Sequence, residues 1–459
     1  MVIGLALTVA GCGADRGAVG DSATSGASSS TGTSPTTQSS GESSNDATGS
    51  ASSGLGTSGS STSAGATSST SSVADTSGSG SGESGSSSGG QVDPSEWDCG
   101  FLQTAVPGGS AGDLVVRSND EHVVAIGFEG EDPRGLHLER FGYDGVSQGE
   151  TTVLDPAGMF QFRLTPRAAW NGSAWGVVYG ARSNASPDTS ARFALVDEEG
   201  AVLEGPTIIS GMRVNEVQIV WTGEAFAMVW RDSTGNLLFG QVDEQGAGAT
   251  DLELLQNVPS IRSHALSLVQ ADNELGLAWT RSGDVEFQRL SIDGTPLTEP
   301  TAVASEIASP PEFVWRGDRY TGVAIAEPAA GERVVRLFDL EPNGTPMGEP
   351  VDLMEGAEHR EFNNSYAAHS LGLADQGDEL GVVFLAMREG DISPEVYFQR
   401  VAYDGVLLGD ELPISDPNAM FGSIDPSLHW TGSGYLAAWR GNSEPSGWNA
   451  WVRSVCPRG

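Results

Sequence analysis

The chain has few cysteines, few basic residues and no long stretch in which apolar residues recur every 3.6 positions. Its 459 residues include three cysteines, and 23 Lys and Arg against 61 Asp and Glu. The absent helical period excludes a largely α-helical domain. Only six of the acids and one base lie in residues 1–91, which leaves 55 acids and 22 bases in residues 92–459. Such acidity excludes nucleic acid and anionic lipid surfaces as expected partners, because both require basic patches.

Motifs that bind metals or perform nucleophilic catalysis are also missing. The six histidines are scattered, none in an HExxH pattern, and no CxxC pair is present, so we expect no zinc site. Asp232 and Asp375 begin acidic turns that do not match an EF-hand loop. Outside residues 13–91, the Gly-x-Ser-x-Gly matches at residues 108–112 and 145–149 lack the helical pattern that follows the serine of a nucleophile elbow, so no such elbow is present. Outside that segment there is also no glycine-rich phosphate loop, and no intact Asp-box of the sialidase kind is present. We therefore expect no metal and no cofactor.

A Trp-x-Gly repeat is the main feature that the chain does have. It is clearest at Trp221-Thr-Gly223, and Phe226 and Trp230 follow at fixed offsets. The same register recurs from Trp170 and from Trp430, and partly from Trp315. Self-similarity at a period of roughly 50 residues indicates a propeller or a solenoid.

Each copy of the repeat is interpreted as four short strands. The first strand ends at the Trp, a glycine turn such as Asn171-Gly172 follows, and an apolar second strand comes next. The third strand runs into an Asp-Gly or similar turn, such as Asp293-Gly294, before a short fourth strand. Weaker copies fit the same register, which brings the total to seven. The sequence therefore predicts an all-β, seven-bladed β-propeller of four-stranded blades.

The repeated Trp and Tyr residues are interpreted as packing between blades. Because the positions recur from copy to copy, a common structural role explains them better than a single ligand site does.

The N-terminus carries an export signal. Residues 1–11 are apolar and end in small residues before Cys12, and Val9-Ala10-Gly11-Cys12 resembles the lipobox of bacterial lipoproteins, although no Lys or Arg precedes it. The resemblance implies that residues 1–12 are a lipoprotein signal segment, that Cys12 is lipidated, and that Gly13 directs the protein to the outer membrane or cell surface. The alternative is a cleavable secretory signal without lipid. Eleven apolar residues are too few to span a bilayer.

Residues 13–91 consist almost entirely of Ser, Gly, Thr and Ala. A segment of this composition buries too little apolar surface to offset the entropy of ordering it, so we expect a disordered tether. Its r.m.s. reach would be roughly 50 Å for about 79 residues. The whole chain resembles predicted bacterial surface lipoproteins that join a lipobox, a Ser/Gly-rich tether and a repeat propeller. Those motifs imply an architecture and no particular activity.

The two remaining cysteines, Cys99 and Cys456, bracket the propeller at residues 92–459. The last repeat ends near the position of its third strand and lacks a fourth. The apolar segment at residues 99–106 precedes the first repeat, so we expect it to join the last blade and close the ring. An exported protein meets an oxidising compartment, and a Cys99–Cys456 disulfide would lock this closure. Two free buried thiols are the alternative.

The mouth of the central channel is the most favourable place for a ligand, since polar groups from several blades converge there. Candidate ligand-binding residues lie at or just before the starts of the first strands. They are Arg167, Glu216, His264, Glu312, His369 and Asp425. Glu312 and Asp425 could form the carboxylate pair of a glycoside hydrolase. A solvated channel rim without chemistry is the alternative.

From these observations we expect an outer-membrane-anchored, monomeric, non-catalytic module that binds an extracellular protein or glycan. The membrane contact is through the lipid anchor only. A carbohydrate-active hydrolase or lyase, and a purely structural envelope lipoprotein, are the two alternatives. Fold alone does not distinguish among these functions.

Overall fold

The computed structural model describes much of the chain between residues 104 and 455. The described ranges are 104–106, 115–118, 123–129, 135–142, 147–156, 161–182, 189–210, 214–248, 252–255, 266–355, 357, 361–362, 366–367, 370–388, 393–415, 423–442 and 448–455. Cys12, Cys99, Cys456 and the whole tether lie outside these ranges, so the anchor and the disulfide stay predictions. Within these ranges no helix is long and apolar enough to cross a membrane.

The described residues form seven four-stranded antiparallel sheets and one two-stranded sheet. The first three sheets are β2 (Val115–Ser118), β3 (Val123–Glu129), β4 (Gly135–Phe141) and β5 (Thr152–Pro156); β6 (Gln161–Trp170), β7 (Ala174–Arg182), β8 (Thr189–Asp197) and β9 (Val202–Ser210); and β10 (Val214–Trp221), β11 (Ala225–Asp232), β12 (Leu237–Asp243) and β13 (Leu252–Leu255).

The next two sheets are β14 (Leu266–Ala271), β15 (Glu274–Arg281), β16 (Asp284–Ser291) and β17 (Thr301–Ala304); and β18 (Glu312–Trp315), β19 (Tyr320–Ala329), β20 (Glu332–Leu340) and β21 (Pro346–Glu355). The hairpin β22 (Glu361–Phe362) and β23 (Tyr366–Ala367) follows, which the repeat did not predict. The sixth sheet is β24 (Leu371–Asp375), β25 (Glu379–Ala386), β26 (Glu395–Ala402) and β27 (Leu407–Pro413). The seventh is β28 (Ser423–Trp430), β29 (Tyr435–Asn442), β30 (Trp448–Val455) and β1 (Thr104–Val106).

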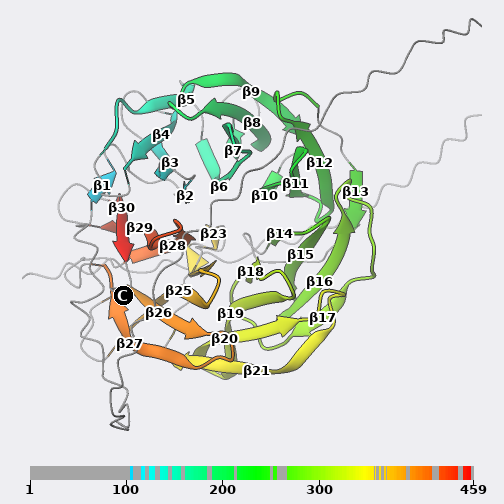
Figure 1. Ribbon diagram of the computed structural model, residues 1–459, viewed down its shortest axis with the longest axis vertical. Coiled ribbons are helices and arrows are strands. Elements are labelled where there is room, and N and C mark those ends of the chain that lie inside the picture. Colours follow the sequence, from blue (N-terminus) through cyan, green and yellow to red (C-terminus); the bar gives the residue numbers. More distant parts are fainter. Residues whose placement is uncertain are drawn as a thin grey trace, which may run out of the picture. The chain divides into compact units, whose positions relative to one another are not determined.

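The first strands of the seven sheets line the middle of the domain. They contact one another in the cyclic order β2, β6, β10, β14, β18, β24, β28 and back to β2. Figure 1 shows them around a common centre, with the fourth strands such as β9 and β21 at the periphery. The prediction of an all-β propeller with four-stranded blades is confirmed.

The seventh sheet takes its outer strand from the start of the described chain. β1 pairs antiparallel with β30, and Thr104, Ala105 and Val106 lie opposite Val452, Trp451 and Ala450. The sequence argument from a missing fourth strand leads to this same segment. Pairing the two ends of the domain covers a sheet edge that would otherwise stay open.

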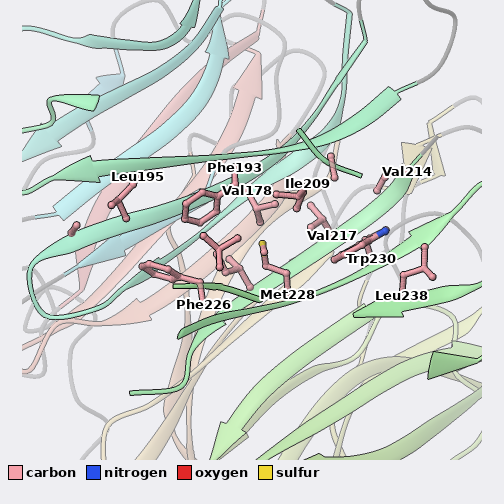
Figure 2. Packing of buried hydrophobic residues seen from close by; sticks show 14 residues of the cluster. Val178, Phe193, Leu195, Ile209, Val214, Val217, Phe226, Met228, Trp230 and Leu238 are labelled. Carbon is pink, nitrogen blue, oxygen red and sulfur yellow. The ribbon is translucent and has the colours of Figure 1, made fainter. Parts of the chain in front are cut away.

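The core lies between successive sheets. A cluster between the second and third sheets contains Phe193 and Phe226, whose ring centroids are 5.5 Å apart, together with Met228 and Trp230. Figure 2 shows these side chains filling the space between the two sheets. Trp230 is fully buried, and a buried large apolar side chain contributes about 2–3 kcal/mol.

In three blades the residue that begins the apolar series of the second strand packs on the preceding sheet, and its size matches the residue that it meets there. Phe226, Tyr320 and Tyr435 meet glycines. A Cβ added to Gly176, Gly276 or Gly381, respectively, would lie within 3.0 Å of these rings. In two other blades the residue equivalent to these aromatics is the smaller Leu275 or Leu380. The position equivalent to the glycines, on the preceding sheet, is then Ala227 or Thr321. In these five pairs of blades, a large residue on one sheet therefore faces a glycine on the other, and a smaller one is matched with Ala or Thr.

Two of these contacts also carry a charge pair. Tyr435 Oη donates a hydrogen bond to Glu379 at 3.3 Å, and Arg400 holds the same carboxylate with two guanidinium nitrogens. The equivalent Glu274–Arg289 pair lies beside Tyr320. Burial, and then the Glu274 carboxylate, raise the pKa of Tyr320 to about 12. At the Phe226 contact, which has no hydroxyl, Ala174 stands in place of the Glu.

Candidate functional site

A cavity of about 500 Å³ lies among the first strands. Its wall is built from β6, β10, β14, β18, β24 and β28, with Trp175 of β7. This volume lies in the range of small-molecule sites, which combine apolar and aromatic walls with a few polar groups. Trp170 and Trp221, both half-buried, supply aromatic surface here, and the half-buried Gln270 supplies an amide.

A polar level of the wall lies three residues before the Trp position of each first strand. Its members are Arg167, Gln218, Ser267, Glu312 and Ser427. Gly372 takes this position in the sixth sheet, and the equivalent residue before β2 lies outside the described ranges. Adjacent sheets are linked at this level: Arg167 Nε donates to Gln218 Oε1 at 3.1 Å, and Gln218 Nε2 donates to the Leu266 carbonyl at 2.7 Å. The Phe313 amide donates to Ser267 Oγ at 3.2 Å. These bonds satisfy buried polar groups and hold the first strands together.

Asp425 begins the wall on β28. Its side chain is 3% exposed, and its backbone has a φ of 53°, in the left-handed region where Asp is tolerated better than most residues. One carboxylate oxygen accepts hydrogen bonds from Arg440 Nε, at 2.7 Å, and from Arg440 Nη2. The guanidinium therefore compensates the buried carboxylate within one sheet.

Glu216 of β10 also uses its carboxylate within the fold, here to hold the neighbouring strand β14. Its Oε1 accepts a hydrogen bond from the Leu266 amide at 2.5 Å, while the Leu266 carbonyl accepts one from Gln218. Both polar backbone groups of Leu266, at the start of β14, are thus fixed by side chains of β10. This carboxylate is 3% exposed and positions a strand.

The predicted candidates divide into three groups. Arg167, Glu312 and Asp425 line the cavity together. Glu216 is buried outside the residues that line it. His264 and His369 lie outside the described ranges. The alternative of a solvated rim is wrong for Arg167, Glu216 and Asp425, which are at least nine-tenths buried. Arg167 and Glu216 are bonded to the neighbouring sheet, and Asp425 is bonded to Arg440 of its own sheet.

Sequence reasoning missed the aromatic part of the wall. It interpreted every repeated Trp as packing between blades, whereas Trp170 and Trp221 are half-buried and face the cavity. Their position at the end of a strand, directly before a turn, was the available signal. His429 of β28 also lines the cavity without having been predicted. Among the described residues, no group of three or more His, Cys, Asp or Glu could hold a metal ion.

Comparison with known proteins shows the fold alone. No family model and no curated protein matches the chain. The chain is similar to the BP39L lectin of Burkholderia pseudomallei at 11% identity and a TM-score of 0.50, over 74% of this chain and 98% of the lectin. It is also similar to the phage phi92 endosialidase (12% identity, TM-score 0.47, 77% and 69% of the two chains). A third similar structure is the β-propeller domain of the Trilobed protease of Pyrococcus furiosus (11%, 0.43, 74% and 95%). At 11% identity, the likeness to the lectin shows a shared propeller fold, and a fold does not determine an activity.

Proposed function

We propose that the propeller is a non-catalytic binding module whose ligand, a glycan or a segment of another protein, occupies the central cavity. The observation that carries this proposal is the composition of the wall: the half-buried Trp170 and Trp221 beside the half-buried Gln270, around about 500 Å³. Aromatic faces and amides bind ligands without taking part in proton transfer.

The bonding of the buried carboxylates favours binding over catalysis. Hydrolysis of a glycosidic bond needs two carboxyl groups that act on the substrate, one as acid and the other as base or nucleophile. Asp425 is bonded to Arg440, and Glu216 is bonded to the Leu266 amide. Both carboxylates therefore hold the fold.

A hydrolase or lyase remains the second candidate, because Glu312 and Asp425 line the same cavity. Glu312 is half-buried, and it is the residue of the pair to change, since replacing Asp425 would also disturb Arg440.

The test uses the full-length protein on a glycan array and against candidate protein partners, with Ala169→Trp as a variant that fills the cavity. Ala169 is a half-buried residue of the wall. We expect the wild-type protein to bind a ligand without altering it chemically, so Glu312→Gln should remove no turnover. We expect Ala169→Trp to lose binding. Turnover that Glu312→Gln abolishes would establish the enzyme instead. Absence of any ligand would favour a purely structural protein.

We further propose that the module is displayed at the outer membrane or cell surface as a monomer, through a lipid on Cys12 and the tether at residues 13–91. The Val9-Ala10-Gly11-Cys12 sequence supports the anchor.

We propose a Cys99–Cys456 disulfide because β1 begins five residues after Cys99 and pairs with β30, which ends at the residue before Cys456. Metabolic labelling with a palmitate analogue should depend on Cys12, and non-reducing mass spectrometry should find the two other cysteines joined. A soluble unlipidated product, or free thiols, would contradict these proposals.

A further inference from the structure

One register position recurs at the end of all seven first strands. It is the residue that pairs with the start of the repeated apolar series in the second strand, and we call it the mouth position. The starts of this series are Val124, Trp175, Phe226, Leu275, Tyr320, Leu380 and Tyr435. Its occupants, in chain order, are Arg117, Trp170, Trp221, Gln270, Trp315, Asp375 and Trp430. Since the first strands contact one another in a ring, these seven residues share one level at one end of the channel.

The four mouth tryptophans differ from the other tryptophans of the repeat. Trp230, Trp279 and Trp439, in the second strands, are at most 1% exposed and fill the space between sheets. Trp170, Trp221, Trp315 and Trp430 are half-buried. Each contacts the aromatic residue opposite it, with ring centroids 4.7–4.9 Å apart. One part of each indole is thus anchored on the core, and the other part faces solvent.

The turns that follow leave the indoles accessible. Each mouth Trp stands two residues before a glycine, as in Trp221-Thr-Gly223 and Trp430-Thr-Gly432. All four glycines have a positive φ between 83° and 98°, and a Cβ placed on any of them would meet nothing within 4 Å. Glycine lets the chain turn tightly without covering the ring before it. A ligand can therefore approach these rings from the turn side.

Core packing alone does not require Trp at this position. Gln270 and Asp375 occupy it in the fourth and sixth sheets, where both are half-buried and the blades have the same four strands. The fold therefore accepts a polar side chain here, and the four indoles call for another explanation. Half-exposed aromatic residues gathered on one face are typical of binding sites.

We infer that the mouth tryptophans bind a neutral oligosaccharide, and that the ligand enters the channel from this end. This inference rests on the proposed binding function and specifies its ligand. Four equivalent rings on separate sheets suit a polymer that repeats one unit, because each unit can meet one ring and the weak contacts add through multivalency. A compact cation could contact fewer of the four indole rings at once. The amide of Gln270 and the carboxylate of Asp375 stand between the rings and can hydrogen-bond to hydroxyl groups. The net charge of −38 disfavours an anionic glycan.

The test titrates full-length protein with cellohexaose and chitohexaose, and follows tryptophan fluorescence and its quenching by acrylamide. The variants are Trp221→Gln and Trp430→Gln, which copy the Gln270 found at the same position. The matched control is Trp230→Phe, which removes a buried indole and copies Phe384 of the sixth sheet. We expect at least one hexasaccharide to bind and to protect the indoles from acrylamide. Each mouth variant should weaken binding about tenfold or more, as substitution of a binding hot spot does, and the control should not.

The other outcomes separate this inference from the proposed function. If a hexasaccharide binds and Ala169→Trp abolishes binding while both mouth variants keep full affinity, the cavity is the site and the mouth inference is overturned. If neither hexasaccharide binds, or if oligogalacturonate or tetramethylammonium binds instead, the ligand class is wrong. Urea unfolding of every variant excludes loss of folding as the cause.

Discussion

The two levels of the channel wall are built from the same strands and serve different purposes. Three residues before the mouth, polar side chains such as Arg167 and Gln218 are buried and bonded to the next sheet. At the mouth, Trp221 and Trp430 rest on the core with part of each ring exposed. Polar residues in a channel are therefore not by themselves a sign of a ligand site, and here the apolar residues are the better sign.

The largest expected effect concerns the buried charge pair. Asp425→Ala leaves Arg440, whose side chain is 15% exposed, without the carboxylate that accepts its hydrogen bonds. Removing one partner of a buried ion pair costs about 3–5 kcal/mol. We expect the free energy of unfolding in urea to fall by about that amount.

The matched control is Asp318→Ala. Asp318 pairs with Arg319, and its side chain is 63% exposed, so its loss should cost less than about 1 kcal/mol. Equal effects of the two substitutions would show that the buried Asp425–Arg440 pair of the wall does not hold the fold, and the comparison would fail.

A smaller effect is expected beneath the mouth. Gly381→Ala places a methyl group against the Tyr435 ring, which in turn supports Trp430. Overpacking a core costs about 1–3 kcal/mol, and urea unfolding would measure it. Adding Tyr435→Leu recreates the Ala227–Leu275 combination found between the third and fourth sheets. The double variant should therefore be less destabilised than the sum of the two single variants. Strict additivity would contradict the matching of sizes between blades.

The smallest effect concerns pH. Burial and the nearby Glu379 raise the pKa of Tyr435 above its ordinary value of 10.0. The folded state therefore keeps this proton more tightly than the unfolded chain, so the stabilisation is complete below pH 10 and is lost as the pH rises further. Tyr435→Phe should cost about 1 kcal/mol at pH 7 and should weaken the alkaline loss of stability. An unchanged pH dependence between pH 9 and 11 would count against this assignment.

Much of the fold could be predicted because its signals are local. Glycine turns recur at fixed offsets, and Gly200, Gly246, Gly294, Gly344 and Gly405 all adopt the positive φ that such turns require. The absent fourth strand of the last repeat directed attention to the segment that pairs as β1. The fit between neighbouring blades was not predicted. It joins residues such as Glu379 and Tyr435, which are 56 positions apart, and no local pattern connects them.

The candidate site was predicted less well, for a physical reason. Periodicity shows that a residue recurs and does not show how much of it is covered, so Trp221 and Trp230 received the same interpretation although only Trp230 is buried. Charged residues near strand starts were expected to lie at the mouth of the channel, either as ligand-binding residues or as a solvated rim. The structure instead encloses Asp425 with Arg440 from the neighbouring strand of the same sheet.

The most direct test of the two-level account is urea unfolding of Asp425→Ala and Trp221→Gln measured side by side. The account predicts that Asp425→Ala lowers the free energy of unfolding by about 3 kcal/mol or more, because a buried charge loses its partner. It predicts a much smaller loss for Trp221→Gln, since Gln270 already occupies the equivalent position in the fourth sheet. A larger loss for Trp221→Gln than for Asp425→Ala would contradict it, because the mouth tryptophans would then be needed for the fold and the buried polar groups of the wall, Asp425 among them, would not.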